Sequence, residues 1–211
     1  LKYPQSGSFR SAITMKDIDS DNEEEAIAFY MPVGDIATVH MLIMDSIDGK
    51  WQSVGDLKSQ STGIDSLNFC DFDGNGIYEI VTTWKTYNAN INQVAVYIYE
   101  NNTIREVSSD HSCSALVTGD FSANEGEELL LMTLFSTERE SSAKLLTLGD
   151  TKNVMTTLGT SPLDPDVVSY TQILAGNIFK DQYGVTIDGC TATGEYSSQL
   201  LYFNSYYNSL E

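Results

Sequence analysis

Oxygen-bearing side chains recur in three short acidic loops of this 211-residue chain. The loops begin at Asp17, Asp71 and Asp120, so their starts lie 54 and then 49 residues apart. Side chains at positions 1, 3, 5 and 9 of each loop, with the backbone carbonyl at position 7, could surround one hard cation. Calcium takes roughly six to eight oxygen ligands and tolerates irregular geometry. The candidate calcium ligands are Asp17, Asp19, Asp21, Glu23 and Glu25, then Asp71, Asp73, Asn75, Ile77 and Glu79, then Asp120, Ser122, Asn124, Gly126 and Glu128.

An EF-hand is the first alternative for such a loop, and the sequence argues against it. That motif requires a Glu at position 12 and a helix on each side. Position 12 is Ala28, Thr82 or Leu131, none of which offers a carboxylate. The segments 80–84 and 129–132 are rich in apolar and β-branched residues, which is typical of buried strands. Each loop is therefore predicted to join two strands.

Solvated acidic turns that bind no metal are the second alternative, because Asp, Asn and Gly favour turns in any case. Gly74 and Gly76 permit the positive φ angles that a tight turn needs. The number of carboxylates predicts that affinity for calcium falls from the first loop to the second and then the third. A worn fourth copy, with Asn177, Phe179, Asp181 and Val185, has lost most of its ligands and is expected to bind no ion.

The repeat extends beyond the loops to whole units of about 50 residues, a period that indicates a repeat architecture. One strand is expected before each loop, at 11–15, 66–70 and 114–118, and one after it, at 26–31, 80–84 and 129–135. Another follows at 38–44, 93–99 and 143–148, and a hairpin turn leads to a last strand that starts at Trp51, Ile104 or Val154. Because it shares this position, Trp51 is expected in the core.

Four antiparallel strands in each unit predict an all-β protein, a β-propeller segment of about four blades. The blades are expected at roughly 9–59, 62–109, 112–160 and 166–209. No low-complexity linker separates them, so residues 1–209 are predicted to form one domain. Residues 210–211 are expected to be a cloning remnant.

These loops and strands resemble the FG-GAP and VCBS-type calcium-loop repeats, which build β-propellers in integrin α-chains and in bacterial surface proteins. The matching residues are Asp17, Asp19, Asp21 and Glu25, then Asp71, Asp73, Asn75 and Glu79, and more weakly Asp120, Asn124 and Glu128. The Phe-Gly-Gly-Ala-Pro motif of integrin blades is absent. The resemblance implies structural calcium, an extracellular or cell-surface bacterial location, and a lipid anchor in the full-length protein.

Family propellers usually close with six to eight blades, and an open array exposes sheet faces. We therefore expect a segment cut from a longer protein, with the remaining blades of that parent as partners. The alternatives are an array that stays open and one that another chain completes.

The chain carries 30 acidic and 11 basic residues, for a net charge of −19. Such a surface repels phosphate backbones and anionic lipid, so neither nucleic acid nor a membrane surface is an expected partner. No apolar run approaches the length of a membrane span.

Catalysis is not expected from the remaining chemistry-bearing residues. His111 and Cys113 lie close in sequence and could form a nucleophilic pair, but such neighbours are more often incidental. His40 falls in a strand pattern. Cys70, Cys113 and Cys190 are expected to be small buried filler, with a Cys70–Cys113 disulfide as the alternative.

Three functions remain open on the sequence. The first is a non-enzymatic, extracellular calcium-binding propeller that binds or scaffolds a protein or glycan ligand. The second is a carbohydrate-binding or polysaccharide-cleaving propeller, and the third is an architectural repeat whose loops bind nothing. A propeller fold alone does not choose among them.

Overall fold

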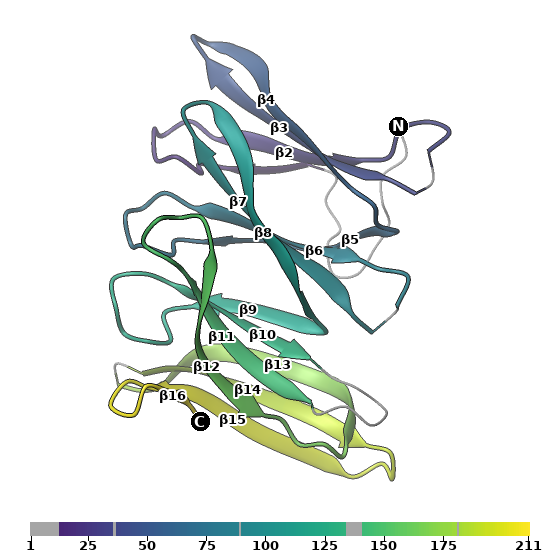
Figure 1. The fold of residues 1–211 in the computed structure, drawn as a ribbon, viewed down its shortest axis with the longest axis vertical. Coiled ribbons are helices and arrows are strands. Elements are labelled where there is room, and N and C mark those ends of the chain that lie inside the picture. The colour runs from purple at the N-terminus through teal and green to yellow at the C-terminus, as the bar shows by residue number, and fades with distance from the viewer. Residues whose placement is uncertain (1–12, 36, 89, 134–140, 181) are drawn as a thin grey trace. The chain divides into compact units, whose positions relative to one another are not determined.

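The computed structural model describes residues 13–35, 37–88, 90–133, 141–180 and 182–211, and every regular element within these ranges is a strand. The strands form four antiparallel sheets of four strands each (Figure 1). In every sheet the spatial order of the strands follows their order along the chain. The prediction of an all-β protein built from four-stranded units is therefore confirmed.

The strand bounds follow the predicted units closely in the first three sheets. The first sheet contains β1 (Ile13–Lys16), β2 (Glu25–Tyr30), β3 (Val39–Ile47) and β4 (Lys50–Ser59). The second contains β5 (Gly63–Cys70), β6 (Glu79–Lys85), β7 (Asn92–Glu100) and β8 (Thr103–Cys113). The third contains β9 (Ala115–Gly119), β10 (Glu128–Thr133), β11 (Ser142–Leu148) and β12 (Met155–Pro162). The fourth contains β13 (Val167–Phe179), β14 (Gln182–Thr191), β15 (Tyr196–Asn204) and β16 (Ser209–Leu210).

The chain divides into two compact units, each with its own apolar core. Unit 1 comprises Leu1–Phe69 and Gly76–His111, and unit 2 comprises Cys70–Asn75 and Ser112–Glu211. The second acidic loop is thus divided, because its first five residues belong to unit 2 and its last four to unit 1.

Strand alternation builds the core of unit 1. Ile27 and Phe29 of β2 pair with Ile43 and Met41 of β3, and all four side chains are buried. Trp84 of β6 packs edge-on against Phe29, with 5.7 Å between ring centroids. β6 is buried along almost its whole length, as its continuous apolar and β-branched run predicts.

The core of unit 2 joins the third and fourth sheets. Leu130 and Met132 of β10 cluster with Val185 of β14. Phe121 lies in the third acidic loop. Its ring packs edge-on against the ring of Tyr183, with 5.1 Å between the ring centroids. A loop residue thereby contributes directly to the core that holds the sheets together.

Two glycines allow successive sheets to approach closely within each unit. Gly55 in β4 pairs with Ile43, and Gly159 in β12 pairs with Leu145, each beside a bulge in the ladder. A Cβ on Gly55 would collide with the Ile104 side chain, and one on Gly159 would lie 2.9 Å from the backbone nitrogen of Leu210. These positions therefore tolerate no larger residue unless a neighbour moves.

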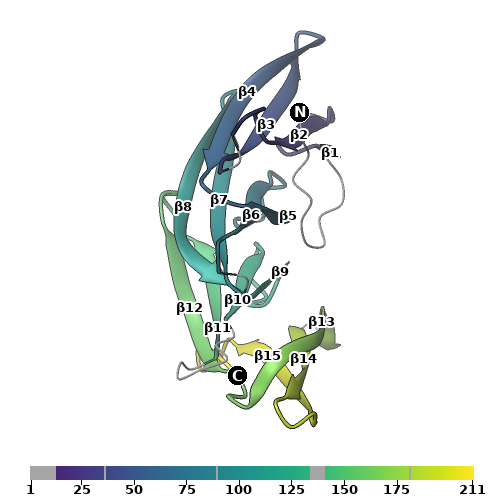
Figure 2. The same cartoon turned by 90° about the vertical axis from the view of Figure 1, so that its right-hand side faces the viewer.

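Figure 2 shows the paired third and fourth strands of the first two sheets, β3–β4 and β7–β8. Their hairpins have the predicted turn chemistry. Asp48 and Gly49 have φ of 54° and 70°, and Asn101 and Asn102 have φ of 52° and 57°. Two consecutive positive φ angles define the type I′ turn, which suits the twist of a hairpin. The third sheet has a wider hairpin, in which Gly149 donates to the carbonyl of Val154 at 2.9 Å.

The structure contradicts one expectation and adds detail at two other places. Trp51 is half exposed, so the prediction that it lies in the core is wrong. The worn fourth loop is replaced by a tight hairpin, in which Phe179 pairs with Gln182, while Asp181 lies outside the described residues. Leu210 is buried and pairs with Phe203, so residue 210 is part of the fourth sheet.

Candidate metal centre

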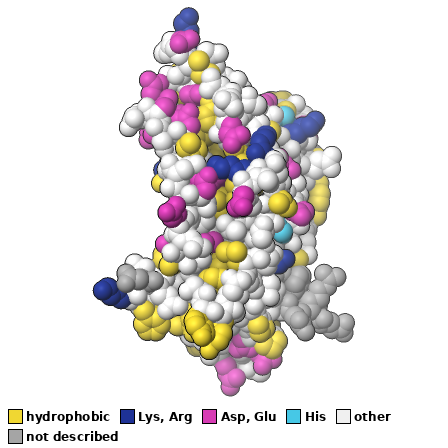
Figure 3. Space-filling view, turned by 60° about the vertical axis from the view of Figure 1, so that its left-hand side comes forward, with side chains coloured by type: hydrophobic (Ala, Val, Ile, Leu, Met, Phe, Trp, Pro, Cys, Tyr) yellow, Lys and Arg dark blue, Asp and Glu magenta, His cyan; other side chains and the backbone are white. Residues whose placement is uncertain are grey.

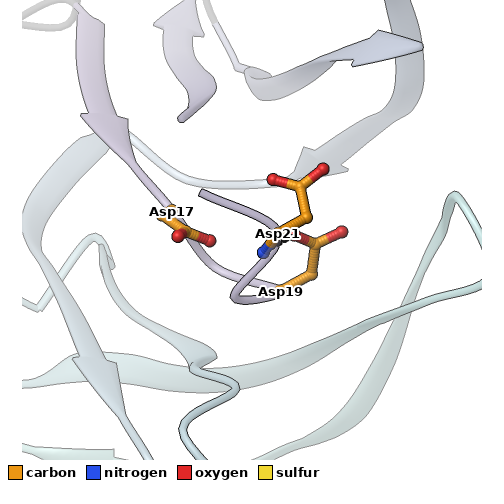
Figure 4. Close-up of side chains that lie close together, drawn as sticks. All are labelled: Asp17, Asp19 and Asp21. Atoms are coloured by element: carbon orange, nitrogen blue, oxygen red, sulfur yellow. Dashed lines mark hydrogen bonds between the residues drawn. The ribbon is translucent and has the colours of Figure 1, made fainter. Parts of the chain in front are cut away.

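The first acidic loop, residues 17–25 between β1 and β2, gathers three carboxylates. Asp17, Asp19 and Asp21 each offer an oxygen, and these oxygens lie within 4.8 Å of one another (Figure 4). Among the described residues, no other set of three or more His, Cys, Asp or Glu side chains meets this condition. The structure thus brings together three of the residues that the sequence analysis proposed as ligands of one ion.

The same carboxylates fold the loop by accepting backbone hydrogen bonds. Asp17 accepts from the N–H groups of Ser20 at 2.7 Å and Asn22 at 3.1 Å, and Asp21 accepts from Glu23 at 2.7 Å. Such bonds are the reason that Asp favours turns. The side chain of Glu23 is exposed, and its backbone N–H is the group that bonds to Asp21.

Positive φ angles recur at equivalent places in the loops. In the first loop Ser20 and Asn22, at positions 4 and 6, have φ of 64° and 71°. In the second loop Gly74 and Gly76 hold the same two positions with φ of 68° and 86°. Ala123 at position 4 of the third loop has φ of 56°. The repeat therefore extends to the backbone conformation.

Glu25, at position 9, is the first residue of β2 and is completely buried. Its Oε2 atom accepts a hydrogen bond from the N–H of Ile18 at 2.8 Å, whereas its buried Oε1 atom has no hydrogen-bond partner. Burial raises the pKa of this carboxyl to about 7, and the charges of Asp19, Asp45 and Asp21 add to the rise against the lowering by the Ile18 bond. A bound cation would give the Oε1 atom of Glu25 a partner and would reduce the repulsion among the carboxylates.

Asp45 is a fifth carboxylate of this cluster that sequence reasoning missed. It lies in β3 with only 4% of its surface exposed and accepts a hydrogen bond from the hydroxyl of Tyr99. Asp45 also raises the pKa of Asp19, although burial and the charge of Asp21 contribute more. The available signal was its position, because Val39, Met41 and Ile43 set an inward-facing alternation that Asp45 continues.

No positive side chain balances this cluster within the described part of the chain. None of its five acids, defined as Asp17, Asp19, Asp21, Glu25 and Asp45, forms an ion pair with a described Lys or Arg. The neighbouring Lys16 ammonium instead lies 3.7 Å from the centroid of the Tyr78 ring. Among the described residues, therefore, no ion pair offsets the charge of the cluster.

The second acidic loop has a different electrostatic environment. In unit 2, Asp71 accepts from the N–H of Asn75 at 3.0 Å, and Asp73 forms an ion pair of 2.8 Å with Lys152. In unit 1, Ile77 is half-buried and Glu79, the first residue of β6, is buried.

The third acidic loop satisfies its own polar atoms. Glu128 is buried at the start of β10 and accepts from the N–H groups of Phe121 at 2.8 Å and Ser122 at 3.1 Å. The Ser122 hydroxyl donates to Glu128 and accepts from the amide of Asn124 at 2.8 Å. Burial raises the pKa of Glu128. Asp120 is exposed, and Gly126 packs by its backbone against the carbonyl of Phe72.

The loops also contact one another through equivalent positions. In unit 1, the N–H of Tyr78 donates to the carbonyl of Ile18 at 2.9 Å. In unit 2, the N–H of Glu127, which also holds position 8 of its loop, donates to the carbonyl of Asp71 at 2.7 Å. Contacts between loops are thus part of the repeat.

A second polar cluster lies in the first sheet, away from the acidic loops. His40 Nδ1 lies 2.9 Å from Asp56 Oδ1, and the Tyr30 hydroxyl donates to Asp56 at 2.7 Å. Two residues were considered for nucleophilic chemistry. His111 Nε2 lies 3.6 Å from Asp110 Oδ1, and Cys113 is completely buried. Cys70 is also buried, as expected of filler.

Comparison with known proteins adds no relative, since neither the protein-family models nor the curated proteins give a match. Within the described residues there is no helix of the length and apolarity that crossing a membrane requires. Acidic side chains are spread over the face that Figure 3 shows, in keeping with the net charge.

Proposed function

We propose that this chain is a non-enzymatic, extracellular calcium-binding β-propeller module, in which the first acidic loop holds a structural calcium ion. Four consecutive four-stranded antiparallel sheets support the assignment of propeller blades. The module would bind or scaffold a protein or glycan ligand, as such repeats commonly do.

The observation that carries the metal proposal is the buried, unpartnered Oε1 atom of Glu25. A buried polar atom without a partner costs roughly 1–3 kcal/mol. Burial and, after it, the charges of Asp19, Asp45 and Asp21 raise the pKa of this carboxyl, so acids of like charge act on it. Hard oxygen donors are the ligands that calcium prefers, so the residues present fit the ion.

Asp17, Asp19, Asp21 and Glu25 are the residues that would hold the ion, with Asp45 as an additional acid from β3. Calcium would supply positive charge where five acids gather and would fix the β1–β2 connection. The role is structural, because it joins a loop to the first residue of the strand that follows it.

The test is calcium-dependent stability in a variant with a damaged first loop. The wild-type melting temperature should rise with calcium and fall with chelator, since a ligand at about 100 times its Kd adds about 2.7 kcal/mol. An Asp19→Asn/Asp21→Asn variant should lose this response. Asp48→Asn, which removes an acid from the β3–β4 hairpin of the same sheet, should keep it. A wild-type melting temperature that ignores calcium would contradict the proposal.

A cleft in unit 2 supports the alternative of carbohydrate binding. It measures about 300 Å³, and apolar Phe72, Leu148 and Leu158 line it together with polar and charged side chains, which are Asn124, Thr147, Asp73, Glu125, Glu128, Asp150 and Lys152. An apolar floor beside hydrogen-bonding groups suits a sugar ring. Binding on a glycan array that Leu158→Asp abolishes would favour this function over a purely structural one.

A further inference from the structure

The cleft of unit 2 is lined by two acidic loops and by the last two strands of the third sheet with the hairpin that joins them. Phe72 comes from the second loop, Glu125 from the third, Asp150 from the β11–β12 hairpin and Leu158 from β12. Every residue that lines the cleft belongs to unit 2. Its volume of about 300 Å³ is at the small end of the range that ligand pockets span, so it suits a small organic molecule.

The apolar part of the cleft includes a residue at a β-bulge. Leu145 pairs with Gly159 and Leu146 pairs with Thr157, so Leu158 has no residue opposite it in the ladder. A bulge of this kind can redirect the side chain of the extra residue. Leu158 is half-buried and lines the cleft together with Leu148, which gives a ligand an apolar surface on which to pack.

The charged part of the cleft carries more negative than positive groups. Asp73 is paired with the Lys152 ammonium at 2.8 Å, and both oxygens of buried Glu128 accept hydrogen bonds from the third loop. Glu125 and Asp150 are exposed, and neither forms an ion pair with a described Lys or Arg. The cleft therefore offers two carboxylates to a ligand beside its apolar surface.

We propose, on the basis of the carbohydrate-binding alternative above, that this cleft binds a cationic amino sugar, whose ring packs on Leu148 and Leu158 and whose ammonium pairs with Glu125 and Asp150. A hydrogen bond from an ammonium to a carboxylate is roughly twice as strong as one between neutral groups. The net charge of −19 repels uronic acids and sulfated sugars. A metal ion would make no use of the two leucines, so the apolar and acidic parts together favour an organic cation.

The test compares a short glucosamine oligosaccharide with its N-acetylated counterpart, which has the same skeleton without the ammonium groups. Calorimetry on the wild-type chain with calcium present should show about tenfold tighter binding of the amine form, the ratio that one charge-assisted hydrogen bond supplies. Glu125→Gln/Asp150→Asn should lower this affinity to that of the acetylated form. Asp166→Asn/Glu195→Gln removes two exposed acids of unit 2 that do not line the cleft, and this matched control should keep the full preference.

Equal affinity of the wild type for the two oligosaccharides would overturn the amino-sugar assignment and leave carbohydrate binding in place. No binding of either oligosaccharide would overturn both. An equal loss in the control variant would show attraction to the average charge of the protein and would also overturn the assignment. Tighter binding of a lysine oligopeptide at the cleft would assign it to a basic protein segment instead. The calcium proposal is judged separately, by the response of the melting temperature to calcium.

Discussion

At the scale of single residues, the buried glutamate at position 9 distinguishes the acidic loops. Glu25 and Glu128 both accept the N–H of position 2 of their own loop, at 2.8 Å in each case. Glu128 also engages Ser122, whereas one oxygen of Glu25 has no partner. The same residue type therefore satisfies its hydrogen bonds in the third loop but keeps a buried oxygen without a hydrogen-bond partner in the first.

The raised pKa of Glu25 predicts a pH dependence of stability in the metal-free protein. The folded state binds this proton more tightly than the unfolded state, in which the ordinary value is 4.5. Stability should therefore fall as pH rises from 4.5 to about 7, by an amount on the order of 2 kcal/mol, and stay low above that range.

Chemical denaturation at several pH values checks this prediction. Glu25→Gln should remove the fall, because the amide does not ionise. With saturating calcium the trend should reverse, since the ion favours the carboxylate. Equal stability of metal-free wild type at pH 5 and pH 8 would show that Glu25 does not control this behaviour.

At the scale of elements, contacts between loops restrict which residues a turn can carry. A Cβ on Gly74 would overlap the carbonyl group of Glu125, and the φ of Gly74 is 68°. Glycine is thus required at this position for two reasons: the backbone conformation and the close approach of the neighbouring loop.

Gly74→Ala is expected to destabilise the protein by about 3 kcal/mol, more than backbone conformation alone would cost. Gly194→Ala is the matched control and should cost about 1 kcal/mol, because Gly194 has φ of 84° and a Cβ added there would meet no atom within 4 Å. Urea denaturation of both variants measures the difference. Similar losses of unfolding free energy in the two variants would mean that the loop containing Glu125 moves aside at little cost.

Much of the arrangement of strands and loops could be predicted from local sequence. Alternating apolar residues located the strands, and the Asp spacing located the three loops. Asp45 and Lys152 could not be assigned to sites in the same way, because each reaches an acidic loop distant in sequence. Trp51 was placed in the core by repeat position, yet the equivalent positions differ in burial, since Ile104 is buried and Val154 is exposed.

The fourth unit differs for a local reason that the sequence did contain. Its expected loop has a single acid, Asp181, where each of the first three loops has several. β13 and β14 instead pair as far as Phe179 and Gln182, with bulges along the ladder. Loss of the ligand pattern is thus accompanied by longer strands.

At the scale of the whole molecule, the net charge of −19 opposes compaction. Sodium chloride should stabilise the metal-free protein by screening this repulsion. Calcium chloride at the same ionic strength should stabilise it further, because a bound ion acts at the first loop and not only on the average charge. Thermal melts in matched salt solutions measure both effects. Equal melting temperatures would assign the calcium response to screening alone.

The assignment of residues 70–75 to unit 2 has a consequence for dissecting this protein. The polypeptide passes from one unit to the other after Phe69, after Asn75 and after His111. A single cut between His111 and Ser112 therefore leaves a short piece of unit 2 attached to unit 1, and the amino-terminal fragment retains Asp71 without Glu127, its partner in two hydrogen bonds. Neither half is expected to refold independently with full stability, so truncation at the apparent midpoint is a poor route to a minimal fragment.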